Sequence, residues 1–195
     1  MARNHEVTKE QLLLDDNGEL REPGWSKSLV QRYDRSMIKA PKWRIKEWDY
    51  YLVMSDKFAG AFTISDDGYI GLQSVSLLTF GDEPWEHTQT VLNPFPMGRI
   101  NLPEDSSVGT TKYMDKRLKM KFDGVVYEFN REKDFGTLDW GRGVWTYDNT
   151  WLWGSGNADL DGNRFGFNIG YGFGNTSAAT ENAIFYIGED LYRKE

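Results

Sequence analysis

Residues 117–130 have the sequence RLKMKFDGVVYEFN, in which apolar and charged side chains alternate on both sides of an Asp-Gly pair. The pair Asp123-Gly124 favours the positive backbone angles of a two-residue hairpin turn. With the turn there, the apolar side chains of both arms share one face. Lys119 then lies opposite Glu128 on the other face, as a favourable cross-strand ion pair. Pattern, turn and charge therefore predict one antiparallel hairpin in a single register.

Comparable patterns recur on both sides of this hairpin. Further strands and hairpins are predicted at Glu47–Met54, Phe58–Phe80, Thr88–Leu92, Trp151–Ala158, Arg164–Phe173 and Ala183–Tyr192. Only Ser26–Ser36, which lies between Pro23 and Pro41, has helical character. About nine short strands with turns roughly every 8–12 residues are typical of an antiparallel barrel or sandwich. The sequence therefore predicts an all-β fold.

No internal repeat or linker divides the chain, and its best candidate for a long loop is Pro94–Ser107. We therefore expect one β domain over residues 1–195. The chain stops at Glu195, just after the turn that would return its last strand. Because an open sheet edge invites aggregation, closed sheets do not normally end half-paired. The sequence thus predicts the N-terminal part of a longer architecture, or an edge that a second copy or a second barrel covers.

Composition excludes several classes of protein. The chain has 23 Lys and Arg against 30 Asp and Glu, a formal net charge of -7, which argues against a nucleic-acid binder. The absence of Cys excludes disulfides, thiolate metal sites and cysteine catalysis. No apolar run approaches the roughly 18 residues of a membrane span, and the first residues lack a secretory signal, so we expect a cytoplasmic protein. His5 and His87 lack metal-ligand spacing, and we expect no metal and no cofactor.

Residues 138–187 contain eleven aromatic residues and no Lys. Within them, Phe165–Gly174 alternates large apolar residues on one face with four glycines and Asn168 on the other. A strand face without bulky side chains permits the close approach of a ligand or of another backbone. A solvent-facing surface normally carries scattered Lys and Glu, so this segment predicts burial or a lined cavity.

Two short runs in this aromatic segment carry charge: Asp139–Gly143 and Thr180–Asn182. A buried ion needs a partner, because its desolvation costs several kcal/mol. Arg142 could pair with Asp139 or Glu181 and hold two strands in register, which is the structural interpretation. In the functional interpretation, Asp139 or Glu181 lines an apolar pocket, where a raised pKa makes it a general acid.

The chain resembles a bacterial family with a domain of unknown function, number two-eight-zero-four, from about Gly24 to Leu191. The resemblance rests on Glu22–Trp25, Trp43–Tyr50, Asp139–Trp145, Trp151–Trp153, the strand that ends at Gly174, and Thr180–Ala183. More distantly, the chain is similar to hydroxyneurosporene synthase and AttH-like proteins, which fold as a pair of lipocalin-like β-barrels. Some of these relatives hydrate or cyclise hydrophobic polyenes. The resemblance implies an antiparallel, lipocalin-like (calycin-type) barrel or strongly curved sheet, as an incomplete part of a two-barrel protein.

These observations favour the binding of a hydrophobic small molecule in an aromatic-lined β-barrel. Both a non-catalytic binder and an acid-catalysed hydratase, isomerase or cyclase fit the pattern, with Asp139 and Glu181 as the candidate proton donors. Indole rings would stabilise a developing cation. The candidate ligand-binding residues are Trp140, Arg142, Trp145, Trp153, Asn168 and Asn182. The alternatives are a structural domain whose rings only pack, and a carbohydrate-binding module whose Trp faces stack on sugar rings.

Overall fold

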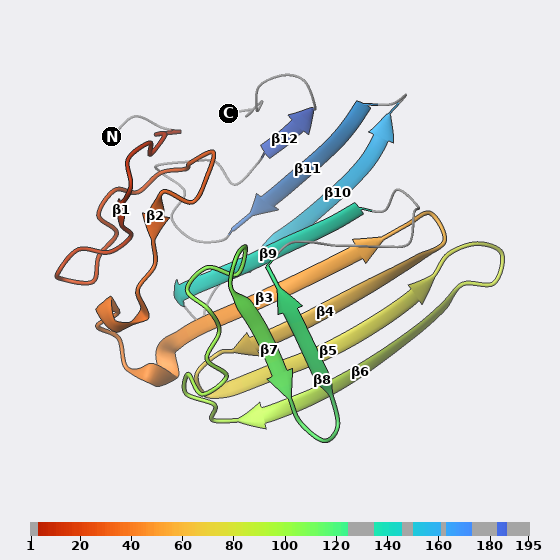
Figure 1. The fold of residues 1–195 in the computed structure, drawn as a ribbon, viewed down its shortest axis with the longest axis horizontal. Coiled ribbons are helices and arrows are strands. Elements are labelled where there is room, and N and C mark those ends of the chain that lie inside the picture. The colour runs from red at the N-terminus through yellow and green to blue at the C-terminus, as the bar shows by residue number, and fades with distance from the viewer. Residues whose placement is uncertain (1–3, 125–134, 146–149, 161–162, 173–182, 187–195) are drawn as a thin grey trace. The chain divides into compact units, whose positions relative to one another are not determined.

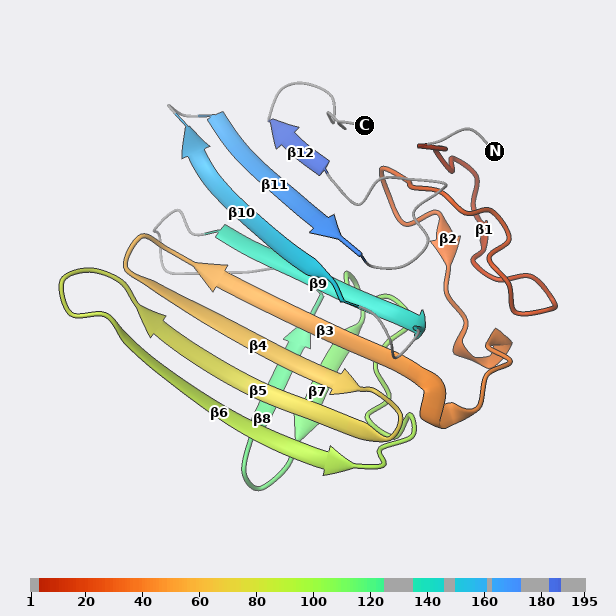
Figure 2. The same ribbon diagram turned by 180° about the vertical axis from the view of Figure 1, so that it is seen from behind.

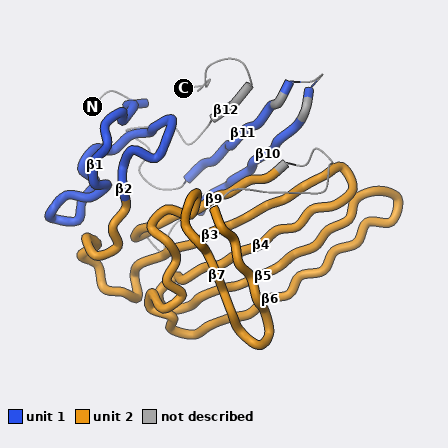
Figure 3. The backbone as a smooth tube through the Cα atoms, in the orientation of Figure 1, with its two compact units in different colours: residues 1–32, 146–195 blue, residues 33–145 orange. Residues whose placement is uncertain are grey.

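The computed structural model describes residues 4–124, 135–145, 150–160, 163–172 and 183–186. These residues form two compact units, residues 33–145 and residues 1–32 together with 146–195 (Figure 3). Apart from the short 3-10 turns η1 (Arg35–Met37) and η2 (Lys42–Arg44), all regular structure in the described part is β, as the sequence predicted. None of the described segments is a helix long and apolar enough to span a bilayer.

The unit of residues 33–145 is built on a five-stranded antiparallel sheet with the strand order β6-β5-β4-β3-β9 (Figures 1 and 2). Its strands are β3 (Ile45–Met54), β4 (Phe58–Asp66), β5 (Ile70–Thr79), β6 (Trp85–Pro94) and β9 (Phe135–Val144). The predicted hairpin at Phe58–Phe80 is confirmed as β4 and β5, with Gly68 at a φ of +78° in its turn. A side chain there would also collide with the carbonyl of Trp43, so the turn requires glycine.

Strand β3 gives the sheet two different faces. Its side chains at positions 45, 47, 49, 51 and 53 are buried, and those between them are partly buried. This is the alternation expected of a strand. We call the first side the Tyr51 face and the second side the Trp48 face. Through the strand register, each residue of the neighbouring strands is assigned to one of these faces.

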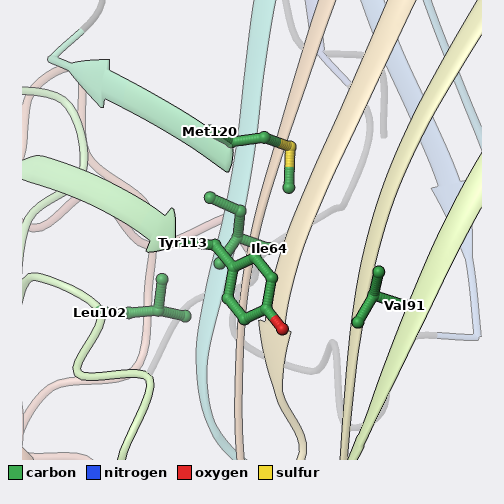
Figure 4. Packing of buried hydrophobic residues seen from close by; sticks show 5 residues of the cluster. All are labelled: Ile64, Val91, Leu102, Tyr113 and Met120. Atoms are coloured by element: carbon green, nitrogen blue, oxygen red, sulfur yellow. The ribbon is translucent and has the colours of Figure 1, made fainter. Parts of the chain in front are cut away.

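A second, two-stranded antiparallel sheet covers the Tyr51 face. It consists of β7 (Thr110–Met114) and β8 (Lys119–Asp123). Figure 4 shows the core between the two sheets, made by Ile64, Val91, Leu102, Tyr113 and Met120. The ring of Phe122 stacks on Tyr51 at a centroid distance of 3.9 Å. Within residues 117–130, β8 is a strand as predicted and Gly124 has the expected positive φ. The pairing of β8 with residues 125–130 stays a prediction, because these residues lie outside the described part.

The other unit contains a three-stranded antiparallel sheet with the order β10-β11-β12. Its strands are β10 (Leu152–Leu160), β11 (Asn163–Tyr171) and β12 (Ala183–Tyr186). The predicted pairing of Trp151–Ala158 with Arg164–Phe173 is confirmed, and β12 confirms the first strand of Ala183–Tyr192, whose later residues lie outside the described part. Within Ser26–Ser36, the structure has strand β2 (Gln31–Arg32), parallel to β1 (Gln11–Leu12), and the start of η1 instead of an α-helix.

The described strands make four separate sheets, and none of these sheets closes on itself. The all-β, mainly antiparallel prediction is therefore confirmed. The lipocalin-like barrel and the single domain over residues 1–195 stay predictions.

Candidate functional site

The alternation of β9 separates residues that are neighbours in sequence. Asp139 lies opposite Tyr50 of β3 and belongs to the Trp48 face. Trp140 and Arg142 lie opposite Asp49 and Glu47, so they belong to the Tyr51 face. Asp139, Trp140 and Arg142 were predicted as candidates for one site because they are close in sequence, but successive side chains of a strand point to opposite sides of its sheet.

On the Trp48 face, Asp139 is partly buried beside an indole. Nε1 of Trp48 donates a hydrogen bond to Oδ2 of Asp139 at 3.4 Å. Burial raises the pKa of Asp139, and the charge of Asp49 raises it further, while the bond from Trp48 lowers it. Burial and the charge of Asp139 also raise the pKa of Tyr50. Asp139 is thus biased toward its protonated form, which is the property that a general acid requires.

Two tryptophans and a glycine complete this surface. The indole of Trp48 lies directly over Gly141, because a Cβ atom at position 141 would collide with the ring. The ring of Trp145 packs against Trp48 with a centroid distance of 4.8 Å and an interplanar angle of 50°. We call Trp48, Tyr50, Asp139, Gly141 and Trp145 the Trp48 site. All are partly buried, and they present apolar rings around one carboxyl group.

Trp48 and Tyr50 were not among the candidate residues identified from the sequence. They lie about 90 positions before Asp139, and no local pattern connects them to it; the link is the pairing of β3 with β9. The clue available in the sequence is that alternate residues of a strand share a face, which puts Trp48 and Tyr50 on one side of Glu47–Met54 and Tyr51 on the other.

On the Tyr51 face, Arg142 forms a buried ion pair with Asp49. Their side chains are 2% and 0% exposed, and Nη2 lies 2.8 Å from Oδ1. Asp49 also accepts hydrogen bonds from the hydroxyl groups of Ser106 (2.7 Å), Thr111 and Tyr51 (3.3 Å). The partner of Arg142 is therefore Asp49, which the sequence analysis did not consider, and not Asp139.

The remaining donors of Arg142 are also engaged. Nη1 donates to the carbonyl oxygens of Trp48 (2.8 Å) and Gly141 (3.0 Å). Nη2 and Nε donate to the carbonyl of Pro103 at 2.9 Å and 3.3 Å, and Nη2 also reaches Oγ of Ser106 at 2.7 Å. The guanidinium lies 5.0 Å from the centroid of the Trp140 ring. Every polar nitrogen of Arg142 therefore has an acceptor within this unit.

Two more buried carboxylates on the Tyr51 face have partners. Glu47 accepts from the Tyr33 hydroxyl at 2.9 Å and pairs with Nη1 of Arg35 at 2.6 Å. Burial raises the pKa of Glu47, and Arg35 opposes that shift. Asp66 accepts from the backbone N–H groups of Gly98 at 2.8 Å and Gly68 at 3.1 Å, which ties the loop after β6 to the β4–β5 turn. These contacts hold loops on the sheet.

The other predicted site residues lie in the second unit or outside the described residues. Nε1 of Trp153 donates to Oδ1 of Asn168 at 2.7 Å, between paired strands β10 and β11. Glu181 and Asn182 fall in residues 173–182, which lie outside the described part. Among the residues that are described, no three His, Asp or Glu side chains gather in an arrangement that could hold a metal ion.

Comparison with known proteins agrees with the resemblance to a family with a domain of unknown function. No curated protein and no solved structure matches the chain. A family match does exist, and it covers residues 4–126 and 119–193, which is most of the chain. The chain therefore belongs to the family described as Domain of unknown function (DUF2804).

Proposed function

We propose that the protein binds a hydrophobic small molecule at the Trp48 site and that Asp139 donates a proton to it. The proposal rests on one observation: a partly buried carboxyl group with a raised pKa lies beside the indole of Trp48, which itself packs against Trp145. Apolar rings favour an apolar ligand because contact removes both surfaces from water. Burial shifts the pKa of this carboxyl group upward, in the direction that favours a role as a proton donor to that ligand.

The chemistry that suits this arrangement is protonation of a carbon–carbon double bond. The O–H bond of Asp139 breaks and a C–H bond forms, which leaves a carboxylate and a carbocation. The ring faces of Trp48 and Trp145 carry the negative part of the aromatic quadrupole and stabilise the cation by cation–π attraction. Loss of a proton from a neighbouring carbon to Asp139 completes an isomerisation. Addition of water, followed by loss of a proton to Asp139, completes a hydration.

The architecture that we propose for the site is a lipocalin-like barrel. Its support is the run of antiparallel neighbours β3, β4, β5 and β6, which is the connectivity of up-and-down barrels. The distant similarity to hydroxyneurosporene synthase and AttH-like proteins points the same way.

Ligand binding can be measured with a panel of fatty acids, isoprenoid alcohols and small polyenes, using thermal shift and tryptophan fluorescence. We expect one of these classes to raise Tm and to change the emission of the wild-type protein. Trp48→Phe should weaken binding about tenfold or more, since the larger indole face is lost. Trp140→Phe is the matched control, because Trp140 lies on the opposite face, and it should bind as the wild type does.

A measurement of turnover distinguishes a non-catalytic binder from an enzyme. Asp139→Asn should keep its affinity for the ligand and lose the conversion of an unsaturated ligand, because an amide has no acidic proton to donate. The proposal fails if no ligand class shifts Tm, or if Trp48→Phe and Trp140→Phe bind equally well. An Asp139→Asn variant that keeps full turnover would remove Asp139 from the mechanism.

A further inference from the structure

We infer that Arg142 is a positioning residue for the Trp48 site and acts on it through the backbone, from the opposite face of the sheet. Nη1 of Arg142 donates to the carbonyl oxygens of both Trp48 and Gly141. These two residues are direct partners across β3 and β9, and the ring of one lies over the other. One guanidinium group therefore binds the backbone carbonyls of both residues that set the position of the indole.

The surroundings of Arg142 fit this role better than contact with a ligand. Its side chain is 2% exposed, and its remaining donors bind Asp49, Pro103 and Ser106. A buried guanidinium with this many acceptors has no donor left for a ligand. Its planar fork also sets the direction of each bond, which the three donors of a single ammonium do not do.

Asp49 keeps the guanidinium in place. It holds Nη2 of Arg142 at 2.8 Å and is itself oriented by the hydroxyls of Ser106 and Thr111. Ser106 bridges the two, since its Oγ donates to Asp49 and accepts from Arg142. The charge of Asp49 also raises the pKa of Asp139 on the other side of the sheet. The ion pair of Asp49 and Arg142 thus lies on the opposite face of the sheet from the Trp48 site. It supports the position of the Trp48 ring and the raised pKa of Asp139.

The geometry of the Trp48 and Trp145 rings provides a readout that does not need a ligand. Two indoles with centroids 4.8 Å apart and planes at 50° couple their transitions and give an exciton couplet in circular dichroism. Loss of the couplet in Trp48→Phe assigns it to the pair of Trp48 and Trp145. Because its sign and size depend on the relative orientation of the rings, it reports positioning rather than overall stability.

The experiment compares Arg142→Lys with Arg35→Lys. Both substitutions keep a positive charge and weaken an ion pair to a buried carboxylate on the same face, but the partly buried Arg35 binds Glu47 and neither carbonyl. We expect both to lower Tm. Arg142→Lys should also lose more than half of the couplet, whereas Arg35→Lys should keep it. An unchanged couplet in Arg142→Lys, or an equal loss in Arg35→Lys, would overturn the inference.

If Arg142→Lys does not fold, Ser106→Ala removes one acceptor of Arg142 more gently. It should reduce the couplet measurably, and an unchanged couplet again overturns the inference. For the ligand, the inference rests on the proposed function, and Arg142→Lys should weaken binding about tenfold through misplacement of the ring. If the wild-type protein binds none of the panel, the proposed function fails, while the couplet still decides the role of Arg142.

Discussion

Asp49 and Asp139 lie on opposite faces of one sheet, and their surroundings differ. Asp49 is fully buried and accepts hydrogen bonds from Arg142 and three hydroxyl groups. Asp139 is partly buried and, among the residues that the structure describes, receives one side-chain hydrogen bond, of 3.4 Å, from the indole of Trp48. One long hydrogen bond replaces little of the water that a carboxylate loses, so burial dominates and the pKa of Asp139 rises. The same residue type is thus structural on one face and chemically available on the other.

The raised pKa of Asp139 predicts a pH-dependent gain in stability for Asp139→Asn. In the folded state its pKa lies above the unfolded value of 3.8. The native state therefore favours the protonated group: its contribution to stability is fully present below the unfolded pKa and is lost as pH rises through the folded pKa. Since Asn is neutral at all pH values, Asp139→Asn should raise Tm at pH 7, with a gain that shrinks as pH falls toward the unfolded pKa. Thermal unfolding over this range measures it.

Asp115→Asn serves as the control, because the pKa of Asp115 is shifted downward whereas that of Asp139 is shifted upward. The neighbouring Arg117 lowers the pKa of Asp115 to about 2, so this exposed group favours its charged form in the folded state. Its removal should bring no gain in Tm at pH 7. An Asp139→Asn variant that is less stable than the wild type at pH 7 would show that Asp139 accepts stabilising bonds as a charged group.

At the scale of the element, strand β3 serves two functions through its alternation. Its buried positions pack against the β7–β8 hairpin, while Trp48 and Tyr50 form the site on the other side. The β4–β5 and β10–β11 hairpins were predictable, because alternation and Asp-Gly turns involve residues close in sequence, whereas strands β7 and β9 were not predicted. Of the candidate residues on or next to β9, Asp139 and Trp145 lie on the Trp48 face, and Trp140 and Arg142 lie on the other face; their part in a site stays a prediction.

The stack of Phe122 on Tyr51 should account for much of the attachment of the β7–β8 hairpin. The rings lie 3.9 Å apart and nearly parallel, and Tyr51 is fully buried. Because Phe122 is only partly buried, Phe122→Ala should cost about 2–3 kcal/mol of unfolding free energy. Denaturant unfolding measures this cost. Lys119→Ala, at an exposed position of the same strand, is the control and should change stability by less than about 0.5 kcal/mol. Equal effects would show that the stack does not hold the hairpin.

At the scale of the whole molecule, the two compact units share one regularity. In both units, long strands that pair and follow one another in sequence are joined by hairpins. Strand β9 differs, because it pairs with β3, which lies far earlier in the chain, and the β7–β8 hairpin that covers the Tyr51 face comes between them. The buried ion pair of Asp49 and Arg142 lies at this return, and Ser106 joins it from the intervening loop. The long-range pairing is therefore supported by specific polar contacts as well as by apolar packing.

Hydrogen exchange should follow the strand order of the sheet in residues 33–145. Strands β3, β4 and β5 have partners on both sides, so their amides should exchange most slowly. Within the described strands, β6 is an outer strand with mostly exposed side chains, and its amides should exchange faster. Mass spectrometry or NMR resolves the difference. If β6 is protected as strongly as β4 and the protection falls on dilution, a second copy covers this edge, as one of the sequence-based expectations has it.

The sequence alone determined the all-β class and the β4–β5 and β10–β11 hairpins, because each of these depends on residues only a few positions apart. Only the tertiary structure decided that Asp139 meets Trp48 and that Arg142 pairs with Asp49. These contacts join residues 91 and 93 positions apart. No local pattern encodes such a partnership; it follows from which strands pair and in which register, since a shift of one residue would exchange the two faces of β9.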